Sequence, residues 1–391
     1  MRNLTRLLLA GATSLALLPA PALAQDIEIP AGSDATLRDL VISSNANPTS
    51  SGSSLDGLLS SLSLVGSSEL PLGGPLLSSD DRYPMPYGEE YDVAQIVDKR
   101  VERVDERVER WFVESPSMGR VIEVQIKKSA TSAAAPFIYM LDGIGGSTPN
   151  SGWINHGAAE RVFGNEDATL IMPTHAAASL YSDWIEDDPA LGRNKWETFI
   201  TKELHPLLVA ETELNHNGKS AIGGLSMGAI GAVHIANTNP KIFDATFGIS
   251  GCYSPMSPVG RQMASFVVTS RGGVLENMWG PYGSEEWIRH DAALDPSGLA
   301  DQAVYLSAAD GTFTEEEKTF YDNYEFTSLA VGGLLERGVL TCTRELDDAM
   351  RAAGMDHHEV HYKEGGAHNW IQFNQELQPA WDHIKPALTR P

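Results

Sequence analysis

One serine of the chain lies in a sequence that can make it a nucleophile. Residues 224–228 read GLSMG, which fits the pattern G-x-S-x-G, where a strand turns sharply into a helix and small neighbours leave room for the turn. The apolar pair Ala221 and Ile222 precedes the pattern, and small residues that favour a closely packed helix follow it. We therefore predict that Ser226 stands at the end of a strand with its hydroxyl exposed, where it can attack a carbonyl carbon.

A serine hydroxyl becomes a good nucleophile only when a base takes its proton and an acid orients that base. After a turn of this kind, the acid and then the histidine follow along the chain. His368, in the glycine-rich loop EGGAHNW after the last predicted strand, is the expected base. For the acid, the residues alone favour Asp310, which follows the predicted strand QAVYLSAA.

Three further histidines, His357, His358 and His361, raise the alternative of a metal site. Successive side chains of a strand point to opposite faces, so His358 and His361 would face away from each other. We expect surface or packing roles for all three. The sequence also contains neither paired metal-ligand spacings nor a P-loop pattern, and we expect no metal and no cofactor.

Negative charge that develops on the attacked carbonyl oxygen needs two hydrogen-bond donors. One is the backbone N–H of Met227, directly after the nucleophile, and the other comes from a loop after an earlier strand. The stretch YMLDGIGG at residues 139–146 supplies such a loop, and its glycines allow the backbone to approach a substrate closely.

Alternating strands and helices are expected to place these residues. Short apolar or alternating runs predict strands at residues 121–128, 136–143, 167–174, 219–226, 244–251, 302–311 and 358–366. Helical patterns cover residues 195–212, 227–239 and 343–354. This order is typical of an α/β fold with a mostly parallel central sheet flanked by helices, whose active site lies at the carboxyl ends of the strands. Residues 91–115, with valines at helical spacing, predict a helix followed by a strand.

The N-terminal part of the chain has a different composition. Arg2 and Arg6, an apolar run and the small residues up to Ala24 predict a secretory signal peptide in residues 1–24. Residues 25–90 are rich in Ser, Gly and Leu and predict a flexible extension, whereas residues 91–391 form the expected catalytic domain. The protein is therefore expected to be secreted to the cell envelope, without a transmembrane span.

Charge and cysteine content narrow the function further. The formal net charge of -24 disfavours a nucleic-acid partner, because phosphate backbones attract basic surfaces. The only two cysteines, Cys252 and Cys342, are expected to form one disulfide, because exported proteins fold in an oxidising environment.

From residue 111 to 376 the chain resembles the mycolyltransferase family of the antigen 85 type, in particular its corynebacterial branch. The matching stretches are SPSMGR at 115–120, YMLDG at 139–143, SGW at 151–153, YSDW at 181–184, KWETFITKEL at 195–204, GLSMG at 224–228, MWGP at 278–281 and HNW at 368–370. Several unrelated motifs in order make this resemblance more specific than the serine motif alone. It implies an α/β-hydrolase fold and the transfer of a mycolyl (corynomycolyl) group through an acyl-enzyme.

The resemblance also assigns roles to individual residues. The nucleophile of the family falls on Ser226 and its histidine on His368, in agreement with the motifs. Its acid is a glutamate that falls on Glu336, so the resemblance favours Glu336 where the residues alone favour Asp310. The second oxyanion donor falls on the N–H of Ile144.

Sugar contacts follow less directly from the resemblance. Asp142 matches an aspartate that binds a trehalose hydroxyl in the family, and its alternative role is to cap the turn after the strand. Gly145 and Gly146 stand where mycobacterial members carry a basic residue near the sugar, which leaves the acceptor open. Trp279 and Trp370 are expected either to stack on the sugar or line an acyl channel, or to belong to the core.

These observations predict a secreted acyltransferase without a cofactor. Its partners would be trehalose mycolate esters as donors, and trehalose monoester, arabinogalactan or protein hydroxyls as acceptors. One alternative is a secreted carboxylesterase, in which water takes the acyl group. Another is a protein of the same fold that binds wall glycans or host matrix and has no reactive serine.

Overall fold

The computed structural model describes residues 83–145, 149–321 and 326–389. The predicted signal peptide, and the predicted extension up to residue 82, lie outside the described residues. The last residues of that extension contact the folded domain: the hydroxyl of Tyr83 accepts a hydrogen bond of 3.0 Å from the N–H of Ala177, and Met85 is buried. The described part of the chain therefore packs on the domain before residue 91.

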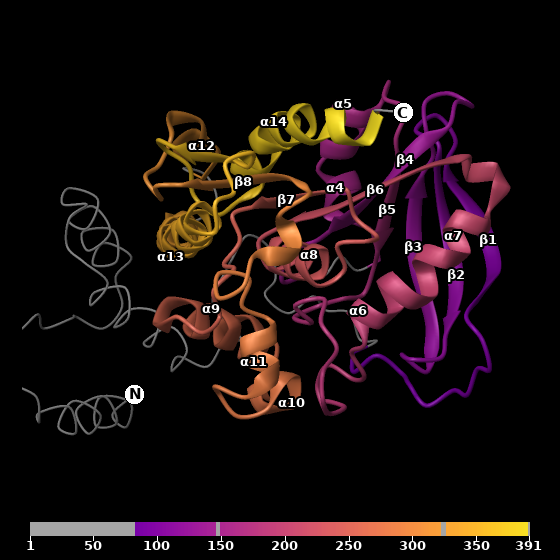
Figure 1. The fold of residues 1–391 in the computed structure, drawn as a ribbon, viewed down its shortest axis with the longest axis horizontal. Coiled ribbons are helices and arrows are strands. Elements are labelled where there is room, and N and C mark those ends of the chain that lie inside the picture. The colour runs from indigo at the N-terminus through magenta and orange to yellow at the C-terminus, as the bar shows by residue number, and fades with distance from the viewer. Residues whose placement is uncertain (1–82, 146–148, 322–325, 390–391) are drawn as a thin grey trace, which may run out of the picture.

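A nine-stranded sheet forms the centre of the domain, with the strand order β1-β2-β3-β5-β4-β6-β7-β8-β9 (Figure 1). The strands are β1 Gln95–Arg103, β2 Val108–Ser115, β3 Arg120–Lys127, β4 Ala135–Leu141, β5 Thr169–Pro173, β6 His216–Leu225, β7 Ala245–Ile249, β8 Ala303–Ala309 and β9 Glu359–Lys363. Neighbouring strands from β5 to β9 are parallel, whereas β1, β2 and β3 pair in antiparallel fashion and β3 is antiparallel to β5. The predicted α/β fold with a mostly parallel sheet is confirmed.

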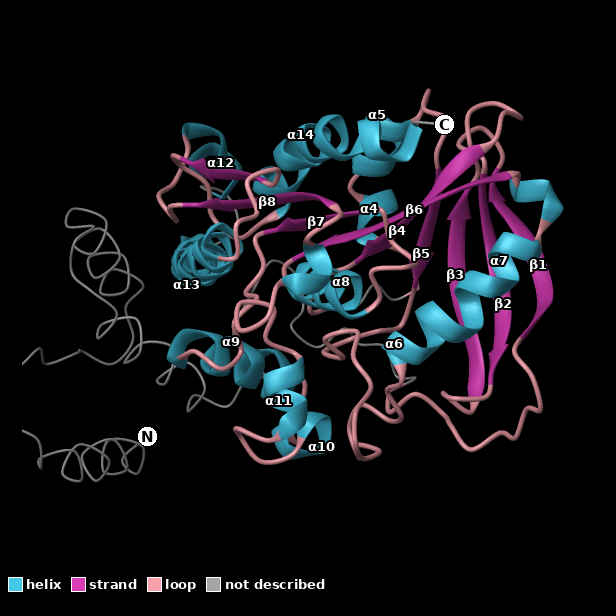
Figure 2. Cartoon of the chain, in the orientation of Figure 1, coloured by secondary structure: helices cyan, strands magenta, loops and turns pink. Residues whose placement is uncertain are grey.

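Helices cover both faces of this sheet (Figure 2). One face carries α4 Gly152–Asn155, α5 Ala158–Phe163 and α14 Trp370–Thr389. Over the other face lie α6 Trp196–Thr198, a π-helix Phe199–Leu204, α7 His205–Ala210, α8 Met227–Thr238, α9 Pro258–Thr269 and α13 Phe326–Ala352. The described residues also form the shorter α-helices α10 Leu275–Trp279, α11 Glu285–Arg289 and α12 Glu315–Tyr321.

Two clusters of buried apolar side chains pack between the sheet and these helices. In β4, Ile138 and Met140 belong to the cluster under α14, whereas Tyr139 and Leu141 belong to the cluster under α8. This alternation follows from the two-residue period of a strand. Among the described residues, no helix combines the length and the apolar character needed to cross a bilayer.

The prediction of a helix within residues 91–115 is wrong. The segment forms β1 and β2, an antiparallel hairpin at the edge of the sheet. Val97, Val101 and Val104 are 48%, 64% and 76% exposed, so their helical spacing marks no buried stripe. Valine is β-branched and favours strands, and pairing with β2 decides the conformation.

Candidate active site

Ser226 lies at the carboxyl end of β6, in the turn that leads into α8. Its φ and ψ are 53° and -124°, a conformation that is unusual for a residue with a side chain and that marks a nucleophile elbow. The N–H of Ser226 donates a hydrogen bond of 2.9 Å to the carbonyl of Ile249, at the end of the neighbouring strand β7. The backbone therefore holds the serine at the edge of the sheet, as the sequence predicts.

Glycines on both sides of Ser226 make this turn possible. A Cβ atom on Gly228 would lie 2.3 Å from the carbonyl oxygen of Leu141, and one on Gly224 would lie 2.5 Å from the carbonyl oxygen of Gly228. Both distances are below any real carbon–oxygen contact, so only glycine fits. The small residues of the motif thus let α8 pack directly against the end of β4.

His368 connects Ser226 to an acid. Its Nε2 lies 2.8 Å from the hydroxyl oxygen of Ser226, and its Nδ1 lies 2.8 Å from Oε2 of Glu336. Glu336 comes from α13 and is fully buried, whereas 12% of the His368 side chain is exposed. The structure therefore brings together the three side chains that the sequence and its resemblance predicted as nucleophile, base and acid.

The other carboxylate oxygen of Glu336 is fixed by two donors. Oε1 accepts hydrogen bonds of 2.6 Å from the hydroxyl of Ser250 and 2.9 Å from the N–H of Ala309. These contacts leave Oε2 facing His368. Sequence reasoning missed Ser250, because a single serine after a strand carries no recognisable signal.

Asp310, the acid that the residues alone favour, faces elsewhere. Its Oδ1 accepts hydrogen bonds from the N–H and hydroxyl of Thr312, at 2.8 and 2.6 Å, and from the N–H of Gly365, at 3.2 Å. It therefore holds the loop before His368 instead of contacting the imidazole. The geometry favours Glu336, in agreement with the resemblance.

Two backbone segments border the serine hydroxyl. Met227 is the first residue of α8, and the first N–H groups of a helix have no acceptor within it and carry a partial positive charge. In the loop after β4, a Cβ atom on Gly143 would lie 3.8 Å from the hydroxyl oxygen of Ser226. Ile144 follows, half-buried, and its carbonyl accepts a hydrogen bond from the N–H of Ala178. Both predicted oxyanion segments thus lie in the region of Ser226.

Asp142 is buried, with 3% of its surface exposed. Its Oδ1 accepts a hydrogen bond of 2.9 Å from the N–H of Gly152, and its Oδ2 accepts one of 2.9 Å from the hydroxyl of Ser151. These bonds attach the loop after β4 to the start of α4. Because these contacts are with α4, the capping of the turn directly after β4 and the contact with a sugar both stay predictions for Asp142.

The two tryptophans expected either to contact substrate or to belong to the core lie in different surroundings. Trp279 is 1% exposed and stacks on His290, with ring centroids 4.2 Å apart, so it belongs to the core. Of the two roles expected for Trp279, its surroundings agree with the core role. Trp370 is half-buried two residues after His368 and stacks on the exposed His156 at 4.2 Å, so its ring remains a candidate contact.

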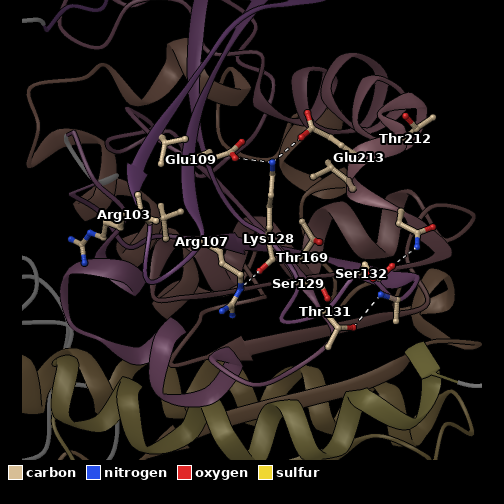
Figure 3. A pocket seen from close by; sticks show the side chains of 16 residues that line it. Arg103, Arg107, Glu109, Lys128, Ser129, Thr131, Ser132, Thr169, Thr212 and Glu213 are labelled. Carbon is tan, nitrogen blue, oxygen red and sulfur yellow. Dashed lines mark hydrogen bonds and ion pairs between the residues drawn. The ribbon is translucent and has the colours of Figure 1, made fainter.

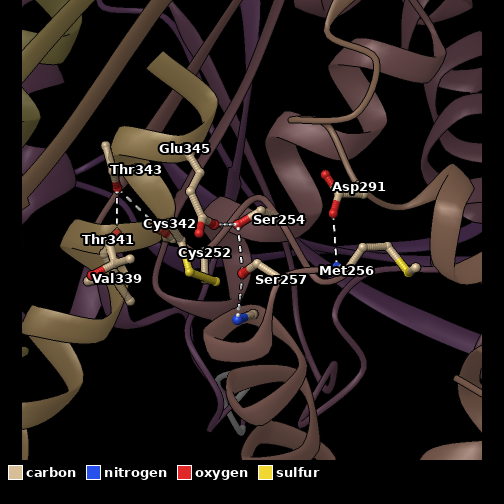
Figure 4. Close-up of a disulfide and its surroundings, with 12 residues drawn as sticks. Cys252, Ser254, Met256, Ser257, Asp291, Val339, Thr341, Cys342, Thr343 and Glu345 are labelled. Atoms are coloured by element: carbon tan, nitrogen blue, oxygen red, sulfur yellow. Dashed lines mark hydrogen bonds between the residues drawn. A yellow bond between two sulfur atoms is a disulfide. The ribbon is translucent and has the colours of Figure 1, made fainter. Parts of the chain in front are cut away.

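The predicted disulfide between Cys252 and Cys342 is confirmed (Figure 4), with a Cα–Cα distance of 4.7 Å. Cys252 follows β7, and Cys342 lies in α13 six residues after Glu336. Next to the disulfide, the hydroxyl of Thr343 donates a hydrogen bond of 3.3 Å to the carbonyl of Gly251. The helix that carries the acid is therefore tied to the segment after β7.

One cluster in the described part of the chain has the composition of a metal site. The ligand atoms of Glu197, His234 and His290 lie within 4.8 Å of one another. However, Arg289 donates to both carboxylate oxygens of Glu197, at 2.6 and 2.8 Å, so a guanidinium already supplies the positive charge. Burial alone would raise the pKa of Glu197, but hydrogen bonds and charge from His234 and Arg289 hold this pKa far below its ordinary value. The cluster is best described as a buried ion network that joins α6, α8 and α11.

The histidines after α13 do not gather around one point. Nε2 of His358 lies 2.7 Å from Asp347, and Nδ1 of His361 lies 2.8 Å from Glu376. The packing and surface roles expected for them agree with these separate partners.

A cavity of about 620 Å³ lies near Lys128, Thr169 and Asn215, at the start of β5 and β6 (Figure 3). Ser226 lies at the opposite, carboxyl end of β6. Lys128 in this cavity pairs with Glu109 at 2.7 Å and with Glu213 at 2.8 Å, so its charge is already neutralised. The cavity is therefore not part of the candidate active site.

Comparison with known proteins gives a consistent result. A family model described as "Putative esterase" matches residues 115–384, a range that includes all three side chains of the hydrogen-bonded row. The diacylglycerol acyltransferase/mycolyltransferase Ag85A of Mycobacterium tuberculosis is 30% identical over 297 residues, which cover 72% of this chain and 81% of that protein. The protein of the same name from Mycobacterium leprae is 29% identical over 295 residues, covering 72% of this chain and 82% of that protein.

Solved structures show the same fold. MPT51 (FbpC1) of Mycobacterium tuberculosis superposes with a TM-score of 0.60 at 22% identity, covering 71% of this chain and 97% of that one. An S-formylglutathione hydrolase from Agrobacterium tumefaciens superposes with a TM-score of 0.51 at 15% identity, covering 75% and 98%. At such identities the likeness concerns the fold, and the expected α/β-hydrolase fold is confirmed.

Proposed function

Because the chain belongs to the esterase family, and within it to the mycolyltransferases of the antigen 85 type, we propose that it is a secreted serine acyltransferase. It moves a mycolyl group from a trehalose ester to a second hydroxyl through an acyl-enzyme. The observation that carries this proposal is the hydrogen-bonded arrangement of Ser226, His368 and Glu336. Nε2 of His368 lies 2.8 Å from the serine hydroxyl, and its Nδ1 lies 2.8 Å from the carboxylate. The disulfide also suits an exported protein.

In the first half of the reaction, the Ser226 oxygen attacks the carbonyl carbon of the donor ester. His368 takes the serine proton at Nε2, and the Glu336 carboxylate stabilises the imidazolium through Nδ1–H. The N–H groups of Met227 and Ile144 are the proposed donors to the oxyanion. His368 then protonates the sugar oxygen, the carbon–oxygen bond of the donor breaks, and the acyl group remains on Ser226.

In the second half, a hydroxyl of the acceptor replaces the departed sugar. His368 takes the hydroxyl proton, the acceptor oxygen attacks the acyl carbon, and the proton returns to Ser226 as the new ester leaves. Trehalose monoester, arabinogalactan and protein hydroxyls are all acceptors of the right chemistry. Trp370 and Asp142, next to the loop after β4, are the proposed sugar contacts.

Hydrolysis of esters is the second candidate function, and the description of the matching family favours it. The same row of side chains would serve, with water as the acceptor. The two functions differ in the product formed from a trehalose ester: transfer yields a new sugar ester, whereas hydrolysis yields free acid. The ratio of these products in one turnover assay decides between them.

The experiment that tests the proposal compares the wild type with Ser226→Ala. With a trehalose monoester as substrate, intact-mass spectrometry should detect an acyl adduct on the wild type and none on the variant. Turnover should fall by roughly four orders of magnitude or more, as in other triads. Ser265→Ala, which removes a hydroxyl from α9, is the matched control and should leave turnover unchanged. Comparable turnover by Ser226→Ala would refute the assignment of the nucleophile.

A further inference from the structure

The loop that carries His368 is held by hydrogen bonds from several segments. The N–H of Gly365 donates to Asp310, that of Gly366 to the carbonyl of Thr312, and that of His368 to the carbonyl of Gly332. The last two bonds measure 2.7 and 3.0 Å. This backbone therefore owes its shape to the segment between β8 and α12 and to α13.

Glu317 in α12 provides the acceptor for the remaining part of this loop. Its Oε1 accepts hydrogen bonds of 2.7 Å from the N–H of Ala367 and 2.7 Å from the side-chain amide of Asn369. These two residues flank His368 on either side. The glutamate side chain is completely buried, so solvent does not compete for these bonds.

The second oxygen of Glu317 has a different task. Oε2 accepts a hydrogen bond of 2.9 Å from the N–H of Thr314. In return, the hydroxyl oxygen of Thr314 accepts one of 3.2 Å from the N–H of Glu317. This reciprocal pair is a capping box, which the sequence Thr-Glu-Glu-Glu allows at the start of a helix. A capping box uses only one oxygen of its glutamate, and here the other oxygen reaches the loop of the proposed base.

Asn369 extends the same connection into α14. Its side-chain oxygen accepts the N–H of Ile371 at 2.9 Å and that of Gln372 at 3.3 Å, while its amide nitrogen donates to Glu317. The start of α14 and the start of α12 are therefore joined through one buried carboxylate. His368 lies between the two points of attachment.

We propose that Glu317 is a positioning residue for the reaction: it fixes the backbone on both sides of His368, so that Nε2 faces the hydroxyl of Ser226. The role rests on the proposed function, because it requires His368 to act as the base. Glu317 itself touches neither Ser226 nor the imidazole, and it acts through Ala367 and Asn369. A shift of the base by about 1 Å is expected to slow the chemical step by about a hundredfold.

Three variants separate this role from simple helix capping. Glu317→Met has a similar length but no acceptor, so it leaves the donors of Ala367 and Asn369 without a partner. Glu317→Gln keeps one carbonyl oxygen. The loop presents two donors, the N–H of Ala367 and the amide of Asn369, whereas the cap presents one N–H and a hydroxyl that can also accept. The glutamine should therefore turn its oxygen to the loop and lose the hydrogen bond from the N–H of Thr314. Thr314→Val removes the capping hydroxyl, keeps the branched shape and leaves the loop bonds intact.

The measurements are kcat and KM on a soluble ester, normalised to the fraction of Ser226 that reacts with a fluorophosphonate, together with the melting temperature. Glu317→Met should lower kcat by about ten- to a hundredfold with KM within about threefold, as a misplaced base would. Glu317→Gln should remain within a few-fold of the wild type. Thr314→Val should lower the melting temperature without changing kcat.

Proton NMR of the protein with ¹⁵N-labelled histidine adds a direct signature. The low-field proton of the His368–Glu336 hydrogen bond should persist in Glu317→Gln and Thr314→Val and be lost in Glu317→Met. Equal kcat values in all three variants, with only the melting temperatures lowered, would mean that Glu317 merely caps α12. If Ser226 of the wild type does not react with the fluorophosphonate, the proposed function fails and the positioning role fails with it.

Discussion

Replacing Glu336 by glutamine should disable the proposed base without disturbing the fold. Oε1 of Glu336 accepts two hydrogen bonds, one of them from the N–H of Ala309, which can only donate. A glutamine must therefore offer its carbonyl oxygen to Ala309, and its NH₂ group then faces Nδ1 of His368. Since NH₂ is a donor, Nδ1 must be unprotonated, and the imidazole proton moves to Nε2. That nitrogen, 2.8 Å from the hydroxyl of Ser226, can then no longer take a proton.

The size of the effect follows from this change of tautomer. In other Ser-His-acid triads, exchange of the acid for its amide lowers kcat by about 10⁴-fold, which corresponds to about 5.4 kcal/mol of transition-state stabilisation. We expect a loss of this order for Glu336→Gln. KM should change little, because Glu336 is fully buried and cannot contact the substrate.

The assay is steady-state turnover of a soluble ester, with the acylation rate measured in a single turnover and the fold checked by thermal melting. Asp310→Asn is the matched control, since it makes the same exchange of acid for amide next to the same loop. An asparagine oxygen can still accept from Thr312 and Gly365, so kcat should stay within about tenfold. If Asp310→Asn loses as much activity as Glu336→Gln, or if Glu336→Gln loses less than tenfold, the assignment of the acid is refuted.

Three further outcomes are expected. Replacing both Cys252 and Cys342 by alanine opens a loop of 90 residues, which should lower the free energy of unfolding by at most about 4 to 5 kcal/mol in denaturant titrations; activity should fall at temperatures where the fold persists, since α13 is released. Gly228→Ala should lower the free energy of unfolding by about 1 to 3 kcal/mol, because the new Cβ atom would lie 2.3 Å from the carbonyl oxygen of Leu141. Gly145→Ala is the control: its Cβ atom would lie in open space, so the melting temperature should not change. Burial, with a smaller contribution from the nearby His216, lowers the pKa of His205 from 6.5 to about 4. Between these two pH values the unfolded chain binds more protons than the folded one, so the free energy of unfolding should fall as the pH drops from 6.5 to about 4. Urea titrations at several pH values should show a weaker pH dependence of this free energy for His205→Gln.

The inner strands β4, β5 and β7 could be predicted from the sequence, because all their residues are buried. Every residue of β7 is buried, and its sequence ATFGI is correspondingly apolar. The edge strand β1 could not be predicted in this way. Three of its positions are only half-buried and the others are exposed, so charged residues separate its valines and the pattern imitates a helix. Pairing with a neighbour, which the local sequence does not contain, decides such a strand.

The positions of Ser226 and His368 were also predictable, because both lie in short patterns at the ends of strands. Glu336 was not predictable from local sequence. It lies within a helix of 27 residues that contains other acids, and only the resemblance to a family distinguished it. Asp310 illustrates the difficulty: it occupies the expected place after β8, yet it holds the backbone of Gly365.

An acid supplied by a helix needs a different kind of support from one supplied by a strand. Strand ends are placed by the register of the sheet, whereas a helix packed on the sheet can slide or rotate. Here α13 is held at two points. Ser250 and Ala309, at the ends of β7 and β8, donate hydrogen bonds to the carboxylate of Glu336. Six residues further along the helix, the disulfide attaches α13 to Cys252. All three contacts come from the same edge of the sheet as Ser226. The sheet therefore sets the distance between nucleophile and acid even though the acid is not part of it.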